Sequence, residues 1–314
     1  MKKALVTGGA GFIGSNLVDA LLEAGVQVVV LDNLITGHRS NLAEVLPKIT
    51  FIEGDIRQRA DVEDAADGCD VIFHEAAVVS VPQTVEDPIG SAAVNELGTL
   101  TVLDVARMQK TTRVVLASSC ALYGDDPVQP KHEGLPARVQ SPYALQKLSG
   151  EMYARLYCKL YGLETICLRY FNVYGPRQDP SSPYSGVISI FMDHSARQLA
   201  PKIYGDGQQS RDFVFVKDVV RANILAATAM AANGQVINIG TGHTVTINQL
   251  WETISRLFEI TIPPCYESRR PGDIRLSMAD VGKAGRTLGF EPAYSFEEGI
   301  KETFEWYGRR RNRK

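Results

Sequence analysis

A glycine-rich turn close to the start of the chain constrains the fold more than any other feature. Gly8, Gly11 and Gly14 follow the spacing G-x-x-G-x-x-G, after the apolar run Ala4–Thr7 and before a segment, 16–24, whose apolar residues recur with a helical period. In such a unit the glycines allow a tight turn and a close approach of the backbone to a pyrophosphate. The N-terminus of the helix offers free N–H groups to the same anion. The turn therefore predicts a dinucleotide site.

The residue that ends the next strand indicates which dinucleotide binds. The apolar strand 26–31 runs into Asp32, eighteen residues after Gly14. An acid at this place suits the ribose hydroxyls of the adenosine and repels a 2′-phosphate, so we expect NAD rather than NADP. His38 and Arg39 lie close enough in the sequence to keep NADP open.

Strands and helices continue to alternate through the first half of the chain. This order predicts an α/β fold with a doubly wound parallel sheet of the Rossmann type. After Asn172 the pattern loosens. We expect a dinucleotide-binding domain at 1–172 and a smaller, mixed α/β substrate domain at 173–314. Within 213–240 the chain is expected to return to the sheet, near 213–216 and 236–239.

Composition and charge exclude several other classes. The net charge is −3, so the global charge favours neither nucleic acid nor an anionic membrane. The sequence has no apolar leader and no run of transmembrane length. Its five cysteines and five histidines are dispersed without metal-ligand spacing. We therefore expect a cytoplasmic protein with no metal, no nucleic-acid partner and no membrane contact.

The stretch S-P-Y-A-L-Q-K, 141–147, carries a candidate proton-transfer group. Ser141 suits an N-cap and Pro142 the first helical position. Tyr143 and Lys147 then share one face of the helix, with Cβ atoms roughly 5–6 Å apart. Lowering the pKa of a tyrosine from about 10 to about 7 takes roughly 4 kcal/mol, which calls for the lysine and a cationic cofactor ring together. The same spacing also occurs on ordinary surface helices.

Ser119, twenty-four residues before Tyr143, completes a Ser/Tyr/Lys set. At this point nearly the whole chain resembles the extended short-chain dehydrogenase/reductase family, and within it the nucleotide-sugar 4-epimerases. The motifs that carry the resemblance are T-G-G-A-G-F-I-G (Thr7–Gly14), L-D-N-L (Leu31–Leu34), G-D-I (Gly54–Ile56), H-E-A-A (His74–Ala77), S-S-C-A-L-Y-G (Ser118–Gly124), S-P-Y-A-L-Q-K, R-Y-F-N-V-Y-G-P-R (Arg169–Arg177), R-D-F-V-F-V-K-D (Arg211–Asp218) and R-R-P-G-D (Arg269–Asp273).

The resemblance implies a role for each matching residue. Tyr143 is expected to be the catalytic base, Lys147 to tune it and hold the nicotinamide ribose, and Ser119 to bind the sugar 4-OH. The implied NAD contacts are Gly8, Gly11, Phe12, Ile13, Gly14, Asp32, Asn33, Asp55, Ile56, Ala76, Ala77, Asn95, Tyr143, Lys147 and Tyr170. The implied UDP-sugar contacts are Ser80, Ser118, Ser119, Tyr143, Asn172, Gly186, Val187, Tyr204, Arg211, Arg270, Asp273 and Ser277.

The implied reaction inverts C4 of a UDP-sugar through a 4-keto intermediate, with NAD bound throughout. In galactose-restricted epimerases a tyrosine closes the pocket where this chain has Ser277. The small serine favours UDP-N-acetylglucosamine and UDP-N-acetylgalactosamine, with UDP-glucose and UDP-galactose also possible. The resemblance further implies a homodimer, paired through the helices 88–107 and 143–161.

The sequence leaves two alternative functions open and disfavours two others. A UDP-glucuronate 4-epimerase or decarboxylase is the main enzymatic one, and a non-catalytic NAD-binding sensor or scaffold belongs to another class. A sugar 4,6-dehydratase is disfavoured, because its acid and base would fall on Cys120 and Ala121. An NADPH-consuming reductase would favour a basic residue in place of Asp32.

Overall fold

A seven-stranded sheet forms the centre of the molecule. The computed structural model describes residues 1–179, 186–269 and 274–311. The strand order is β11-β6-β5-β4-β1-β2-β3, and all neighbouring strands run parallel. This confirms the predicted doubly wound sheet. Its strands are β1 (Lys3–Thr7), β2 (Gln27–Asp32), β3 (Thr50–Glu53), β4 (Val71–His74), β5 (Arg113–Ser119), β6 (Glu164–Tyr170) and β11 (Gln235–Ile239).

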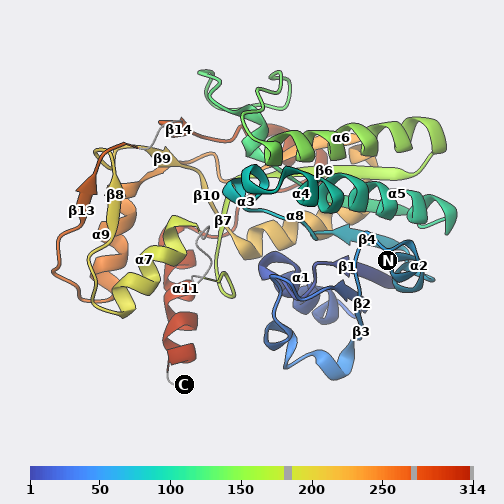
Figure 1. Ribbon diagram of the computed structural model, residues 1–314, viewed down its shortest axis with the longest axis horizontal. Coiled ribbons are helices and arrows are strands. Elements are labelled where there is room, and N and C mark those ends of the chain that lie inside the picture. The colour runs from blue at the N-terminus through green and yellow to red at the C-terminus, as the bar shows by residue number, and fades with distance from the viewer. Residues whose placement is uncertain (180–185, 270–273, 312–314) are drawn as a thin grey trace.

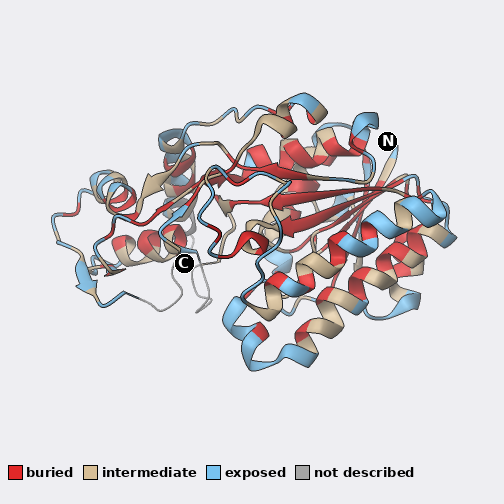
Figure 2. Ribbon diagram, turned by 90° about the horizontal axis from the view of Figure 1, so that it is seen from above, coloured by how far each residue is buried: buried red, intermediate tan, exposed pale blue. Residues whose placement is uncertain are grey.

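Helices cover both faces of this sheet (Figure 1). Successive strand residues point to opposite faces, so Ala4 and Val6 belong to one apolar core and Leu5 to the other. In Figure 2 the buried strands lie between helices that bury only their inner sides. One face carries α1 (Phe12–Glu23), α8 (Val216–Thr228) and α10 (Gly282–Leu288), and the other carries α2 (Arg59–Ala66), α5 (Thr99–Met108) and α6 (Pro142–Tyr161).

The helix that we expected over 88–107 is interrupted. It consists of α4 (Pro88–Ala92), a π-helical turn (Ala93–Gly98) and α5, and it is preceded by α3 (Val81–Glu86). A single π-helical turn inside a longer helix often marks a functional position. Here the turn contains Asn95, one of the predicted cofactor contacts.

The second half of the chain builds a smaller unit beside the sheet. One segment differs from expectation, because Phe213–Phe215 forms β10 and pairs with β7 (Asn172–Tyr174) instead of joining the large sheet. Aromatic side chains, among them Tyr174 and Trp251, fill the core of this unit. Its other elements are α7 (Val187–Ala196), β8 (Lys202–Tyr204), β9 (Ser210–Arg211), β12 (Val245–Thr246), α9 (Ile247–Leu257), β13 (Cys265–Glu267), β14 (Leu276–Ser277) and α11 (Phe296–Arg311).

Candidate active site

The glycine turn between β1 and α1 is closely packed at the edge of the sheet. Gly8 has a φ of +69°, and a Cβ on Gly14 would lie only 2.2 Å from the Gly8 carbonyl oxygen. The Gly11 N–H donates to that same oxygen at 3.0 Å. Among the described residues no side chain caps the start of α1 at Phe12, so its first N–H groups and the positive end of the helix dipole remain available to a pyrophosphate.

Two acidic residues lie at the ends of neighbouring strands beside this turn. Asp32 is the last residue of β2, and Asp55 follows shortly after β3. The Asp32 carboxylate accepts backbone N–H groups of Ala10 at 2.9 Å and Leu34 at 2.8 Å, while burial raises its pKa. Asp55 accepts from Asn33 at 2.9 Å. Its hydrogen bond with Arg57 lowers the pKa of Asp55 to about 2. Asp32 thus lies where the adenosine ribose is expected, and Asp55, a further expected NAD contact, is bound to the neighbouring Asn33.

The two basic residues that kept NADP open are engaged elsewhere. Arg39 pairs with Glu53 at 3.1 Å and stacks over the Phe51 ring at 4.5 Å. The His38 ring nitrogen Nε2 lies 3.1 Å from the Asp179 carboxylate. Each side chain is thus engaged by a carboxylate other than Asp32, although His38 lies near enough for its charge to oppose the rise in the pKa of Asp32.

The Ser/Tyr/Lys set comes together at the ends of β5 and α6. Ser141 caps α6 by accepting the Ala144 N–H at 3.2 Å. One turn into the helix, Lys147 Nζ donates to the Ala117 carbonyl at 2.9 Å and lies 6.0 Å from the centre of the Tyr143 ring. A hydrogen bond joins Tyr143 to Ser119. The predicted catalytic residues therefore share one place.

The protein by itself does not favour a phenolate here. Burial raises the pKa of Tyr143 to about 12, although the hydrogen bond from Ser119 opposes the increase. Burial also lowers the pKa of Lys147 to about 8, against the charge of Glu75. A buried, unpaired charge is costly, so an ionised Tyr143 requires further positive charge. The cationic ring of NAD would supply that charge, as well as accept a hydride, when the cofactor is bound.

The side chain of Asn95 connects the loop after β4 with helix α6. Its amide accepts the Val78 N–H at 2.8 Å, donates to the Val78 carbonyl at 2.9 Å and donates to Gln146 at 2.7 Å. Val78 follows the predicted cofactor contacts Ala76 and Ala77, and Gln146 precedes Lys147. Asn95 therefore fixes the loop after β4 to the catalytic helix.

A buried histidine extends this network below the sheet edge. Thr99 donates to the Asn95 carbonyl at 2.7 Å, so its oxygen accepts from His74 Nε2 at 3.0 Å. Thr7 then donates to His74 Nδ1 at 2.7 Å. These directions define the neutral imidazole, and burial lowers the pKa of His74 to about 3.

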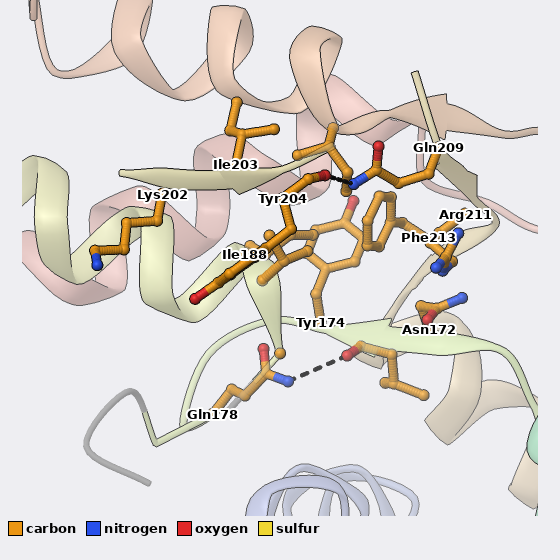
Figure 3. A pocket seen from close by; sticks show the side chains of 14 residues that line it. Asn172, Tyr174, Gln178, Ile188, Lys202, Ile203, Tyr204, Gln209, Arg211 and Phe213 are labelled. Carbon is orange, nitrogen blue, oxygen red and sulfur yellow. Dashed lines mark hydrogen bonds between the residues drawn. The ribbon is translucent and has the colours of Figure 1, made fainter. Parts of the chain in front are cut away.

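A cavity of about 270 Å³ lies in the smaller unit, among β7, α7, β8 and β9 (Figure 3). Asn172 and Arg211 lie at one end of it and Lys202 at the other. It brings together five of the residues that we expected at the nucleotide: Asn172, Gly186, Val187, Tyr204 and Arg211. Further lining residues that the sequence did not reveal are Val173, Tyr174, Gln178, Ile188, Lys202, Ile203, Gln209, Phe213 and Ile247.

Ser277 belongs to β14, the strand that pairs with the one carrying the cavity residue Arg211. It is 8% exposed and pairs in register with Arg211, across β14 and β9. Cys120 is close enough for its charge to affect the pKa of Tyr143, and Arg211 in turn affects the pKa of Cys120, which burial raises to about 12.

Other predicted substrate contacts are placed differently. The Ser118 hydroxyl donates to Glu151 at 2.5 Å inside the core, so this bond takes the place of the sugar contact that we expected. Ser80 caps α3 by accepting the Gln83 N–H at 3.1 Å. Arg270 and Asp273 lie outside the described residues.

Comparison with known proteins shows the family. The profile of the NAD dependent epimerase/dehydratase family matches residues 4–240, and this chain belongs to that family. The UDP-glucose 4-epimerase of Mycolicibacterium smegmatis is 41% identical over 310 residues, which cover 97% of this chain and 98% of that protein.

Two solved structures are also closely similar. One is a UDP-N-acetylglucosamine 4-epimerase of Methanobrevibacter ruminantium in complex with UDP-N-acetylmuramic acid (TM-score 0.94, 40% identity, 98% and 99% of the two chains covered). The other is a UDP-glucose 4-epimerase of Thermotoga maritima with UDP-glucose (TM-score 0.93, 39% identity, the same coverage).

Across 1–179, 186–269 and 274–311, no helix is both long and apolar enough to cross a membrane. Within the same ranges, no three His, Cys, Asp or Glu side chains cluster in a way that could hold a metal ion.

Proposed function

We propose that the protein is a reversible UDP-sugar 4-epimerase that acts on UDP-N-acetylglucosamine and UDP-N-acetylgalactosamine, and also on UDP-glucose and UDP-galactose. One observation carries the proposal: Ser119, Tyr143 and Lys147 meet at the same edge of the sheet as the glycine turn. Residues 1–172 supply the NAD site, and 173–314 supply most of the site for the nucleotide sugar.

The geometry supports a proton cycle centred on Tyr143. Ser119 would orient the 4-OH of the sugar and Tyr143 would take its proton, while bound NAD would supply the acceptor for the hydride on C4. The 4-keto sugar formed by these two losses would rotate within the site. With hydride restored to the opposite face of C4, Tyr143 would return the proton to the oxygen. The net result is inversion at C4 with no change in oxidation state.

The choice of sugar rests on Ser277. Its small side chain stands where galactose-restricted epimerases have a tyrosine, on the residue that pairs with Arg211, and this small size supports a pocket that admits an N-acetyl group at C2. A pocket that admits the larger group rejects a smaller sugar by only about 1–3 kcal/mol. Of the two similar solved proteins, the one from Methanobrevibacter ruminantium is named for the acetylated sugar and the one from Thermotoga maritima for the non-acetylated sugar. A serine at this position is consistent with both activities.

The proposed homodimer rests on exposed apolar side chains. Helix α6 presents Met152, Leu156 and Leu160, which are 58%, 47% and 62% exposed. Neighbouring helices add Ile89 and Leu97, which are 83% and 61% exposed. An apolar surface of this kind on adjacent helices suits a second copy of the chain.

The test is to incubate the purified protein with each of three substrates, without added NAD, and to follow the anomeric signals by NMR. The substrates are UDP-N-acetylglucosamine, UDP-glucose and UDP-glucuronate, and each is also incubated with the protein omitted, as a control for base-dependent decay. Inversion of the first two is expected. Action on UDP-glucuronate alone would assign the alternative 4-epimerase or decarboxylase, and no turnover of any substrate would support a non-catalytic NAD-binding role.

A further inference from the structure

The short helix α3 buries a polar residue and exposes its apolar ones. Thr84 is its one buried residue and is fully inaccessible to solvent. Val81 and Val85 of the same helix are exposed. Burial of apolar surface would favour the opposite orientation, with the valines inside. The burial of Thr84 therefore depends on the hydrogen bonds that its hydroxyl makes.

The Thr84 hydroxyl has one partner on its own helix and one on the catalytic helix. It donates to the Val81 carbonyl, three residues earlier in α3, at 2.7 Å. Its oxygen accepts the backbone N–H of Tyr143 at 3.2 Å. A hydroxyl has one hydrogen and two acceptor lone pairs, so both bonds form together. They join α3 to the first turn of α6, against which it packs.

The bond to Tyr143 completes the N-terminus of α6. The first N–H groups of a helix have no partner within the helix and need acceptors from elsewhere. In α6, Pro142 has no N–H, and the Ala144 N–H donates to the cap hydroxyl of Ser141 at 3.2 Å. The N–H of Tyr143, between them, finds its acceptor outside the helix, on Thr84. The local sequence caps one position, and α3 caps the position that carries the phenol.

Tyr143 is therefore held at its backbone as well as at its side chain. The side chain is hydrogen-bonded to Ser119, and the backbone N–H is hydrogen-bonded to Thr84. Proton transfer requires a base within hydrogen-bonding reach of the proton that it takes, and a misplacement of about 1 Å can cost about 10²-fold in rate. A shift of the Tyr143 backbone would move the phenol away from Ser119, and the bond to Thr84 opposes that shift.

We propose that Thr84 is a positioning residue of the site: its hydroxyl fixes the backbone of Tyr143 and so holds the phenol beside Ser119 for proton transfer. This role rests on the proposed epimerase function. It also gives α3 a task in the reaction, because the helix supplies an acceptor that α6 lacks.

Variants of Thr84 separate the hydroxyl from the shape of the side chain. Thr84→Val keeps the shape and leaves the Tyr143 N–H buried without its acceptor, and Thr84→Ser keeps the hydroxyl. Thr84→Ala is a second variant without the hydroxyl, for use if Thr84→Val does not fold. Thr253→Val is the matched control, because the Thr253 hydroxyl likewise donates to a carbonyl of its own helix, that of Gln249 in α9, at 3.0 Å.

Amide hydrogen exchange of protein labelled with ¹⁵N at tyrosine measures the contact directly, with the Tyr143 signal assigned through Tyr143→Phe. In Thr84→Val we expect the Tyr143 N–H to exchange at least about fivefold faster and kcat to fall at least about fivefold, because a buried donor has lost its acceptor. KM should stay close to that of the wild type, and so should the exchange of Tyr153, farther along α6. Thr84→Ser should restore exchange and kcat, and Thr253→Val should change neither.

Unchanged exchange of Tyr143 in the variants without the hydroxyl would overturn the role of Thr84. Equal acceleration at Tyr153 would do so as well, since the whole helix would then be less stable. A raised KM with unchanged kcat would show that the hydroxyl serves α3 and not the base. The exchange measurement needs no turnover. A wild-type protein without epimerase activity therefore refutes the proposed function, while exchange still decides whether Thr84 holds Tyr143.

Discussion

Lys147 on α6 donates a hydrogen bond of 2.9 Å to the carbonyl oxygen of Ala117 on β5. The contact joins helix and strand two residues before Ser119 and one helical turn after Tyr143. Because a turn of helix separates Tyr143 from Lys147, the same bond places the phenol opposite the serine. The bond therefore ties the helix that carries Tyr143 to the strand that carries Ser119.

Replacing Tyr143 by phenylalanine should abolish most of the turnover and leave the cofactor bound. The ring is kept, so packing is preserved, but the group that takes the 4-OH proton is lost. General acid–base catalysis contributes about 10²–10⁴-fold, and we expect kcat to fall by that range. The measurement is kcat together with the NAD content of the purified variant. Tyr153→Phe, on the same helix and partly exposed, is the matched control and should retain full activity.

Ser277→Tyr should restrict the substrate range. A large ring beside Arg211 fills the space assigned to the N-acetyl group, so kcat/KM for UDP-N-acetylglucosamine should fall at least about tenfold relative to UDP-glucose. Ser277→Ala keeps the space and should change neither value by much. If the tyrosine leaves the acetylated substrate unaffected, another residue selects the sugar.

Much of this site could be predicted because its parts are local in the sequence. The glycine turn, the N-cap Ser141 and the Tyr143–Lys147 spacing depend on neighbours within one turn or one helix. The structure shows that these parts lie at the same edge of the sheet. It also confirms the parallel sheet that the alternating apolar runs predicted.

The parts that sequence reasoning missed depend on contacts between distant residues. The π-helical turn contains Asn95, which forms hydrogen bonds to Val78 and Gln146. The helical period of the sequence gives no sign of these contacts. Phe213–Phe215 has the apolar composition of a central strand, yet it pairs with β7. Ser118 was expected at the sugar, and its partner Glu151 lies thirty-three positions away in the sequence.

The stability of the protein should fall in mild acid because of His74. Its pKa is about 6.5 in an unfolded chain and about 3 in the folded protein, so the folded state binds fewer protons between these values. The stabilisation is complete above about pH 6.5 and is lost as the pH falls towards 3. Between pH 6.5 and 4.5 this group should account for about 2 kcal/mol of the lost unfolding free energy.

Urea unfolding of the wild type and of His74→Gln at several pH values measures this contribution. Carboxylates contribute to both proteins alike, so the difference in slope isolates the histidine. Parallel pH profiles for the two proteins would show that His74 does not stay neutral in the fold.

The apolar surface of α6 should hold two copies together. Leu156→Arg places a charge in the proposed interface, and analytical ultracentrifugation should show a shift from dimer to monomer. Met230→Arg is the control, because Met230 is 88% exposed and lies elsewhere; it should leave the dimer intact. A wild type that sediments as a monomer contradicts the proposed pairing.

The central claim is that hydride leaves C4 and returns to the same carbon without leaving the site. The most direct measurement follows UDP-N-acetylglucosamine, or UDP-glucose, deuterated at C4, with purified protein and no added NAD, by NMR and mass spectrometry. The account predicts inverted product that retains the deuterium at C4. Inverted product that has exchanged its deuterium for solvent hydrogen would contradict it.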